Sequence, residues 1–293
     1  MIRLTIVIPV ILVFFSQPAR ADLAATHYHK AMAQKRQGKL ADAIGSLKKA
    51  LEVRGDYAAA HRSIAILYRK KKNYEKAVFH GERAVALQPE SAETLYSLAL
   101  CYHYAGRKDD ARSTLKKAAK LKPDDPQIRF TLGVSLIRRD PAEALPHLQA
   151  AVKAMPNDAD YLHQLGLAHR KMTSRLTKTE DAAKRAIHYK KAEQHLERAA
   201  ALKPSAALEF DLGVLYRRTD RALRAITHYE KAIKLKPTMK AAYWDLGMLY
   251  KIAKRYDDSV KAFEKYLSLS GGKGKDADIA RMRMQEARKA KGK

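Results

Sequence analysis

The chain has 293 residues, and 58 Lys and Arg against 31 Asp and Glu give it a net charge of +27. Hydrophobic residues make up 46% of the sequence, which excludes a wholly disordered chain. A single cysteine excludes a disulfide-built fold and a cysteine-rich zinc or iron–sulfur site. The positive charge favours acidic proteins, anionic membranes, acidic polysaccharides or nucleic acid as neighbours, without distinguishing among them.

The first 21 residues have the pattern of a secretory signal peptide. Arg3 gives a positive start, and the apolar run over residues 4–15 is shorter than the roughly twenty residues that span a bilayer. Ala19-Arg20-Ala21 is an A-x-A cleavage signature, so we expect cleavage after Ala21. The alternative is an uncleaved membrane anchor. Neither asparagine starts a glycosylation motif, so a bacterial envelope is the expected address, with the periplasm as first choice and secretion as second.

The rest of the chain repeats with a period of roughly 34 residues. Prolines that close the repeating phrase fall at Pro89, Pro123, Pro156, Pro204 and Pro237. A column of small residues recurs between them, at Ala31, Ala65, Ala99, Gly133, Gly166, Gly213 and Gly247. Small side chains let two paired helices approach closely, and each proline ends the second helix because it cannot continue the hydrogen-bond ladder. The pattern therefore predicts a series of helix hairpins.

These residues resemble the tetratricopeptide repeat, a helix–turn–helix unit of about 34 residues. The resemblance implies an all-α, right-handed superhelical solenoid of about seven repeats plus a C-terminal capping helix. We place the solenoid at 22–273, with repeats at 24–57, 58–91, 92–125, 126–158, 159–205, 206–239 and 240–273. A capping helix and a basic tail follow at 274–293.

The fifth repeat is longer than the others by about fourteen residues. We expect this extra length to add about two turns to both of its helices and to project a hairpin at 170–191. Thr177 and Glu180 have the spacing of a capping box ahead of the second helix.

One stripe of each first helix lines the concave groove in the tetratricopeptide resemblance. Three residues before the small column, this stripe carries mainly aromatic side chains: Tyr28, Arg62, Tyr96, Phe130, His163, Phe210 and Trp244. Four and five residues after the column, it carries a basic edge that includes Arg69, Lys70, Arg138, Arg170, Arg217 and Arg218. Such a groove suits an extended peptide or a helix with apolar and acidic side chains. The structural alternative is that the rings pack between repeats and the cations compensate helix C-termini.

The known carboxylate-clamp variant of the family places Lys and Asn on this face. Here those positions are aromatic and apolar, so that activity is not transferred. No zinc-protease, nucleophile-elbow or phosphate-loop motif is present, and we expect no enzymatic activity, no cofactor and no metal.

We predict a protein–protein interaction adaptor or scaffold in the bacterial envelope that binds a peptide or helix of a partner in the groove. The alternative is binding of an anionic polymer or surface, such as lipopolysaccharide or an acidic glycan, through the basic second helices. Export makes nucleic acid the least favoured ligand. Self-association through a solenoid edge or the 170–191 hairpin is a third possibility, and we expect no transmembrane segment after signal cleavage.

Overall fold

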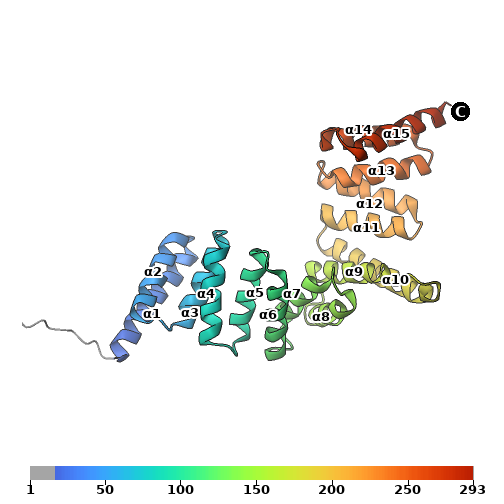
Figure 1. The fold of residues 1–293 in the computed structure, drawn as a ribbon. Coiled ribbons are helices and arrows are strands. Elements are labelled where there is room, and N and C mark those ends of the chain that lie inside the picture. The colour runs from blue at the N-terminus through green and yellow to red at the C-terminus, as the bar shows by residue number, and fades with distance from the viewer. Residues whose placement is uncertain (1–16, 293) are drawn as a thin grey trace, which may run out of the picture. The chain divides into compact units, whose positions relative to one another are not determined.

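The computed structural model describes residues 17–292, which form fifteen α-helices, one 3-10 helix and no strand (Figure 1). The helices are α1 (Gln17–Arg36), α2 (Leu40–Val53), α3 (Ala58–Lys70), α4 (Tyr74–Leu87), α5 (Ala92–Tyr104), α6 (Lys108–Leu121), α7 (Pro126–Leu136), α8 (Pro141–Ala154), α9 (Ala159–Thr173), η1 (Thr179–Asp181), α10 (Ala182–Leu202), α11 (Ala206–Arg218), α12 (Ala222–Leu235), α13 (Lys240–Ile252), α14 (Tyr256–Ser270) and α15 (Lys275–Lys291). None of these helices is long and apolar enough to cross a membrane.

Most of the predicted signal peptide, residues 1–16, lies outside the described residues. The predicted cleavage signature Ala19-Arg20-Ala21 lies within the first two turns of α1, which begins at Gln17.

Contacts divide the chain into two compact units, Met1–Pro123 and Asp124–Lys293. In the first unit the hairpins are α1–α2, α3–α4 and α5–α6, and in the second they are α7–α8, α9–α10, α11–α12 and α13–α14. The helix α15 packs on α14 and closes the second unit. The predicted all-α fold of stacked helix hairpins with a closing helix is confirmed.

The two helices of a hairpin approach closely at the small column, and in the second unit this column leaves room for a large side chain of the second helix. In the first unit the column is alanine, and Ala31, Ala65 and Ala99 are buried. In the second unit it is glycine, and a Cβ added to Gly213 would lie 2.6 Å from the ring of Tyr229. At Gly247 the added Cβ would lie 2.8 Å from the ring of Phe263. The size of one residue thus sets the spacing of each helix pair.

The elongated fifth repeat differs from the prediction. The second helix α10 has 21 residues against 14 in α12, a gain of about two turns, but α9 has only 15 residues against 13 in α11. The remaining length forms the segment 174–181, where the Arg185 guanidinium donates to the carbonyls of Leu176 (2.9 Å) and Lys178 (2.7 Å). These bonds fold the chain into a turn, so α9 ends at Thr173 and its predicted extension is wrong.

The predicted capping box of Thr177 and Glu180 is also wrong. Asp181 is the N-cap residue of α10 and makes no side-chain capping bond, while Glu180 lies in η1.

Neighbouring repeats are joined by a recurring group of one tyrosine, one glutamate and one arginine. At one joint the Tyr102 hydroxyl donates to Glu82 (2.8 Å), and the Arg107 guanidinium lies 4.2 Å from the centre of the Tyr102 ring and 3.3 Å from Glu82. Burial and the hydrogen bond to Glu82 raise the pKa of Tyr102 to about 12. The same arrangement recurs as Tyr250–Glu230–Arg255. The Tyr216 hydroxyl contacts two glutamates, Glu193 at 3.2 Å and Glu197, and Arg221 pairs with Glu193 and lies over the Tyr216 ring. In each group the glutamate comes from the preceding repeat, so the group ties two repeats together.

In two of the repeats, neutral histidines pack between the first and the second helix of the same repeat. His169 Nδ1 lies 2.9 Å from His188 Nδ1, and the His169 ring stacks on His195 at 5.8 Å. An Nδ1–Nδ1 hydrogen bond needs one ring nitrogen to donate and the other to accept, as neutral imidazoles do. Burial, followed by the charges of His188, His195 and Lys191, lowers the pKa of His169 to about 3. In the first unit His80 pairs with His61 at 3.0 Å, and burial lowers its pKa to about 4.

Replacement of Gly213 by Ala is expected to lower the free energy of unfolding by about 1–3 kcal/mol, because the new methyl group overlaps the Tyr229 ring. Gly45→Ala is the control, since nothing lies within 4 Å of a Cβ at Gly45 on α2. This control is expected to raise the free energy of unfolding by up to about 1 kcal/mol through helix propensity. Urea denaturation of both variants tests the difference, and a shift in the same direction for both would contradict it.

A double-mutant cycle of Glu193→Ala and Arg221→Ala is expected to show a coupling energy of about 1 kcal/mol. The pair is bidentate, with distances of 2.7 and 2.8 Å, and both side chains are partly buried. The control cycle uses Asp160 and Lys203, whose charged atoms are 3.8 Å apart and whose side chains are 73% and 70% exposed. We expect less than about 0.5 kcal/mol for that pair. Equal coupling energies in the two cycles would show that the ion pair between the repeats contributes no more to stability than an exposed surface pair.

The free energy of unfolding is expected to fall as the pH decreases below about 6.5. Unfolded chains bind a proton on each histidine near that pH, whereas the folded chain keeps His169 neutral down to about pH 3. The slope contributed by one such histidine is about 1.4 kcal/mol per pH unit. Denaturation between pH 7.5 and 4.5 measures it, and His169→Gln is expected to flatten the slope while the exposed His103→Gln leaves it unchanged. An unchanged slope in His169→Gln would refute this account.

Candidate binding surface on the first helices

The first helices form the inner side of each unit. Contacts between first helices of neighbouring repeats join α3 to α5 and α9 to α11, and α13 likewise contacts the closing helix α15. Among the described residues, no two second helices of neighbouring repeats reach a comparable degree of contact. Elements that approach one another more closely lie on the inner side of a curved stack, so we refer to the first-helix side of each unit as its inner side.

The aromatic residues of the predicted stripe are half-buried and partly packed against the protein itself. Phe130 stacks on Tyr161 of the next repeat, with ring centres 4.2 Å apart. Phe210 packs on Tyr229 of its own repeat at 5.4 Å, and Tyr28 packs on Tyr57 at 5.2 Å. Part of each ring therefore stabilises the stack, and only the remaining part is accessible to a partner.

The basic edge contains both exposed and engaged side chains. Lys70, Arg138 and Arg218 are exposed. In contrast, the Arg69 guanidinium lies 5.2 Å from the centre of the Tyr104 ring, and Arg62 is half-buried.

In the second unit, one acid brings two of the predicted residues together. Asp211 on α11 accepts from His163 Nε2 and from the Arg170 guanidinium, both at 2.9 Å and both from α9. All three side chains are mostly buried. Burial lowers the pKa of Arg170, and the charge of Asp211 opposes this shift. Arg170 and His163 thus join two repeats and are less available to a partner than Arg218.

A second acid lies one repeat further on. Asp245 on α13 is 3.8 Å from Arg217, and its side chain is only 16% exposed. Burial raises the pKa of Asp245, and Arg217 opposes this shift. The buried Tyr229 lies close to both, and burial together with the charge of Asp245 raises its pKa.

Sequence reasoning missed both acids. Asp211 and Asp245 stand two residues before the small column, immediately after Phe210 and Trp244 of the predicted stripe. They are the only acids at that position among the seven repeats, and this was the signal available in the sequence.

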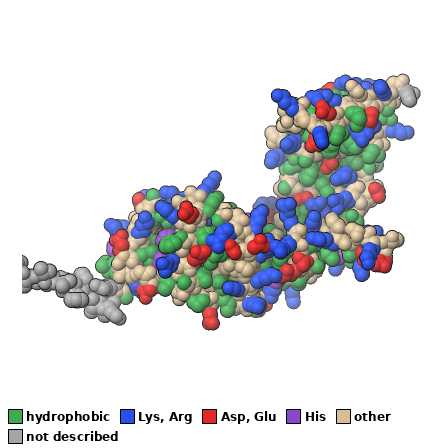
Figure 2. Space-filling model, in the orientation of Figure 1, with side chains coloured by type: hydrophobic (Ala, Val, Ile, Leu, Met, Phe, Trp, Pro, Cys, Tyr) green, Lys and Arg blue, Asp and Glu red, His purple; other side chains and the backbone are tan. Residues whose placement is uncertain are grey.

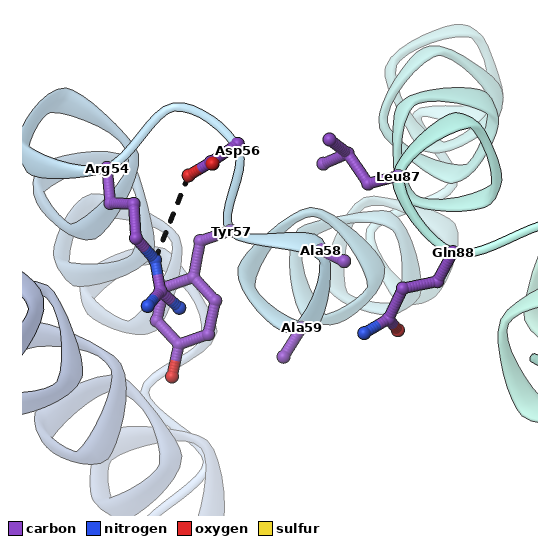
Figure 3. A pocket seen from close by; sticks show the side chains of 7 residues that line it. All are labelled: Arg54, Asp56, Tyr57, Ala58, Ala59, Leu87 and Gln88. Carbon is purple, nitrogen blue, oxygen red and sulfur yellow. Dashed lines mark ion pairs between the residues drawn. The ribbon is translucent and has the colours of Figure 1, made fainter.

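A pocket opens in the first unit at the start of α3 (Figure 3). Its volume is about 390 Å³, and its lining side chains come from the turn before α3, from α3 itself and from the end of α4. Arg54 lies 3.6 Å from the centre of the Tyr57 ring and 4.0 Å from Asp56. In this pocket the Arg54 cation is therefore already engaged by a ring and an acid of the protein itself.

Positive charge is not restricted to the inner side. Figure 2 shows Lys and Arg side chains over the visible face of both units, interspersed with apolar and acidic ones. Exposed lysines such as Lys49, Lys120 and Lys234 lie on second helices. No cluster of His, Cys, Asp and Glu able to hold a metal ion occurs within residues 17–292.

Sequence profiles of the tetratricopeptide repeat match residues 22–90 and, in two overlapping matches, residues 181–240 and 210–274. A profile described as subunit 3 of the anaphase-promoting complex, or cyclosome, matches residues 70–151. No curated protein matches the sequence significantly.

Solved structures resemble the chain in fold. PilF of Pseudomonas aeruginosa is 18% identical with a TM-score of 0.60, over 74% of this chain and 94% of that one. A tetratricopeptide repeat protein of Parabacteroides merdae is 14% identical with a TM-score of 0.62, over 91% and 99%. YrrB, described as a tetratricopeptide repeat protein with an unusual peptide-binding site, is 22% identical with a TM-score of 0.54, over 71% and 97%. At these identities the similarity shows a common fold.

Proposed function

Since the chain belongs to the tetratricopeptide repeat family, we propose that it is a non-enzymatic adaptor that binds a peptide or helix of a protein partner on its inner side. The observation that carries this proposal is the combination, on the first helices, of partly accessible rings with the exposed cations Lys70, Arg138 and Arg218. Rings of this kind accept apolar side chains, and the cations accept acidic ones. The peptide-binding site named for the structural neighbour YrrB supports the same type of ligand.

The proposed partner-binding surface contains the residues predicted from the repeat spacing, but these residues differ in how much of each side chain a partner can reach. Phe130, Phe210 and Tyr28 offer only the faces that are not packed on neighbouring rings. Arg170 and His163 act mainly by holding two repeats in place through Asp211. The exposed cations Lys70, Arg138 and Arg218 form no ion pair within residues 17–292, so they are the groups that meet an acidic partner.

We propose an envelope location for this adaptor, with export directed by residues 1–21 and the periplasm as its compartment. The basis is the apolar run that precedes the A-x-A signature in the sequence. A partner in the same compartment would then be an envelope protein.

A second candidate function is binding of an anionic polymer or membrane surface. The observation that favours it is the set of exposed lysines on second helices, which extends the positive charge beyond the inner side. Binding of this kind depends on the number of charges and falls steeply with salt.

Two triple variants with equal charge changes distinguish the two functions. The inner variant carries Lys70→Glu, Arg138→Glu and Arg218→Glu on first helices or their ends. The outer variant carries Lys49→Glu, Lys120→Glu and Lys234→Glu on second helices. Both variants alter exposed side chains only, so both are expected to fold.

Capture from envelope extract, with quantitative mass spectrometry, is the measurement. The adaptor proposal expects a discrete protein that the wild type and the outer variant retain at high salt and that the inner variant loses by at least about tenfold, as lost charge-assisted bonds imply. Equal losses in both variants, with polymer or lipid as the bound material and release at high salt, would contradict the adaptor and support the second function.

A further inference from the structure

The second unit has its own pocket, at the start of α13 and beside the closing helix α15. Its volume is about 380 Å³, and it is lined by Lys240, Ala241, Trp244, Asp245, Tyr266 and Asp276. These residues come from the first turns of α13, the last turns of α14 and the first turn of α15.

Two aromatic rings meet in this pocket. The centres of Trp244 and Tyr266 are 5.0 Å apart and the ring planes cross at 63°, so the rings form a corner. Trp244 also contacts the buried Phe263, with ring centres 5.8 Å apart and ring planes at 84°. Indole gives the strongest attraction for a cation among aromatic side chains, because the face of its ring carries partial negative charge.

Two carboxylates line the same pocket. Asp245 is paired with Arg217 at 3.8 Å. Within residues 17–292, Asp276 forms no hydrogen bond or ion pair, and no Lys or Arg lies over the ring of Trp244 or Tyr266. Lys240, the only cation of the lining, is exposed and makes no ion pair with either acid in the described part of the chain. The pocket therefore presents an aromatic corner and an available acid without a matching cation.

In the pocket of the first unit, a ring and an acid are accompanied by an arginine of the protein itself. Both pockets lie at the start of a first helix and at the end of the second helix of the same repeat, and the alanines Ala59 and Ala241 occupy the same position relative to the small column. In the first unit Arg54 lies over the Tyr57 ring beside Asp56 (Figure 3). In the second unit the ring and the acid are present, and no arginine among residues 17–292 lies over the Trp244 ring.

We propose that the pocket of Trp244, Tyr266 and Asp276 binds a cationic side chain, a lysine or arginine of a partner peptide. The cation lies against the face of the Trp244 ring and donates to the Asp276 carboxylate. In the first unit Arg54 likewise lies over a ring, that of Tyr57, with the carboxylate of Asp56 4.0 Å away. An anionic ligand is disfavoured, because two carboxylates line the pocket. This site selects a basic residue on a chain whose surface otherwise repels one, since the net charge is +27.

This inference extends the proposed function, because it names one side chain of the partner. That the cation belongs to a protein partner rests on the proposed function, whereas binding of a cation in the pocket does not. The test uses small cations, so failure of the pocket leaves partner binding on the inner side unaffected. Failure of the inner-side variants would likewise leave the pocket intact.

Trp244 is the only tryptophan of the chain, so its fluorescence reports on this pocket alone. The probes are N-acetyl-lysine amide, N-acetyl-arginine amide and the neutral isostere N-acetyl-norleucine amide, titrated at constant ionic strength. We expect a saturable fluorescence change with the two cations, with a midpoint in the millimolar range because a single residue makes few contacts, and no saturable change with norleucine amide.

The test variant and its control each remove one negative charge from the same helix turn. Asp276→Asn is expected to weaken binding of the lysine and arginine probes on the order of tenfold. Asp278→Asn removes an exposed acid that pairs with Arg281, and it is expected to leave binding unchanged. Both acids lie in the first turn of α15, so both variants remove one favourable charge from the N-terminus of that helix, and circular dichroism verifies that each is folded. An equal response to norleucine amide, no saturable response to the cations, or equal binding by the Asp276→Asn variant would overturn the proposal.

Discussion

The close approach of two helices within each repeat is the constraint on which this structure depends. A hairpin of two short helices cannot bury its apolar face alone, so it is stable only when its helices pack closely and a neighbour covers the result. In the second unit a side chain of the second helix fills the space that each glycine of the small column leaves. This side chain is a leucine opposite Gly133 and Gly166, and it is the ring of Tyr229 or Phe263 opposite Gly213 and Gly247. The buried Ser259 also fits this scheme, because its hydroxyl donates to the Gly247 carbonyl at 2.7 Å.

The joints between repeats use polar groups in addition to apolar burial. A tyrosine hydroxyl reaches back to a glutamate of the preceding repeat, and an arginine covers the ring and completes the ion pair. At the first joint Lys48 and Asn73 occupy the corresponding glutamate and arginine positions beside Tyr68. There Asn73 caps α4 instead, by accepting from the backbone amide of Lys76. The repeats thus share one backbone plan while differing in how firmly neighbours are joined.

Sequence alone predicted the helix hairpins, because close packing demands small residues and these recur at a constant spacing. It also predicted the closing helix, from the residues that follow the last repeat. It did not predict where α9 ends, since that depends on Arg185 reaching back to two carbonyls, and side-chain-to-backbone bonds leave no periodic trace. Nor did it predict that His163 and Arg170 meet Asp211, because these residues are 48 and 41 positions apart and belong to different repeats. The stripe of aromatic residues was visible in the sequence, but how much of each ring remains accessible depends on neighbours such as Tyr161 and Tyr229.

The pairing of a small residue on the first helix with a large one on the second also bears on how such a chain can change by recombination. Because Gly213 and Tyr229 belong to the same repeat, a duplication or deletion that breaks at the prolines between repeats carries both partners together. A break inside a hairpin would set the first helix of one repeat against the second helix of another. An alanine of the first unit's column, such as Ala65, set in the place of Gly213 would bring its Cβ within about 2.6 Å of the Tyr229 ring. The whole hairpin is therefore the smallest piece of this protein that can be gained or lost without repacking its interior.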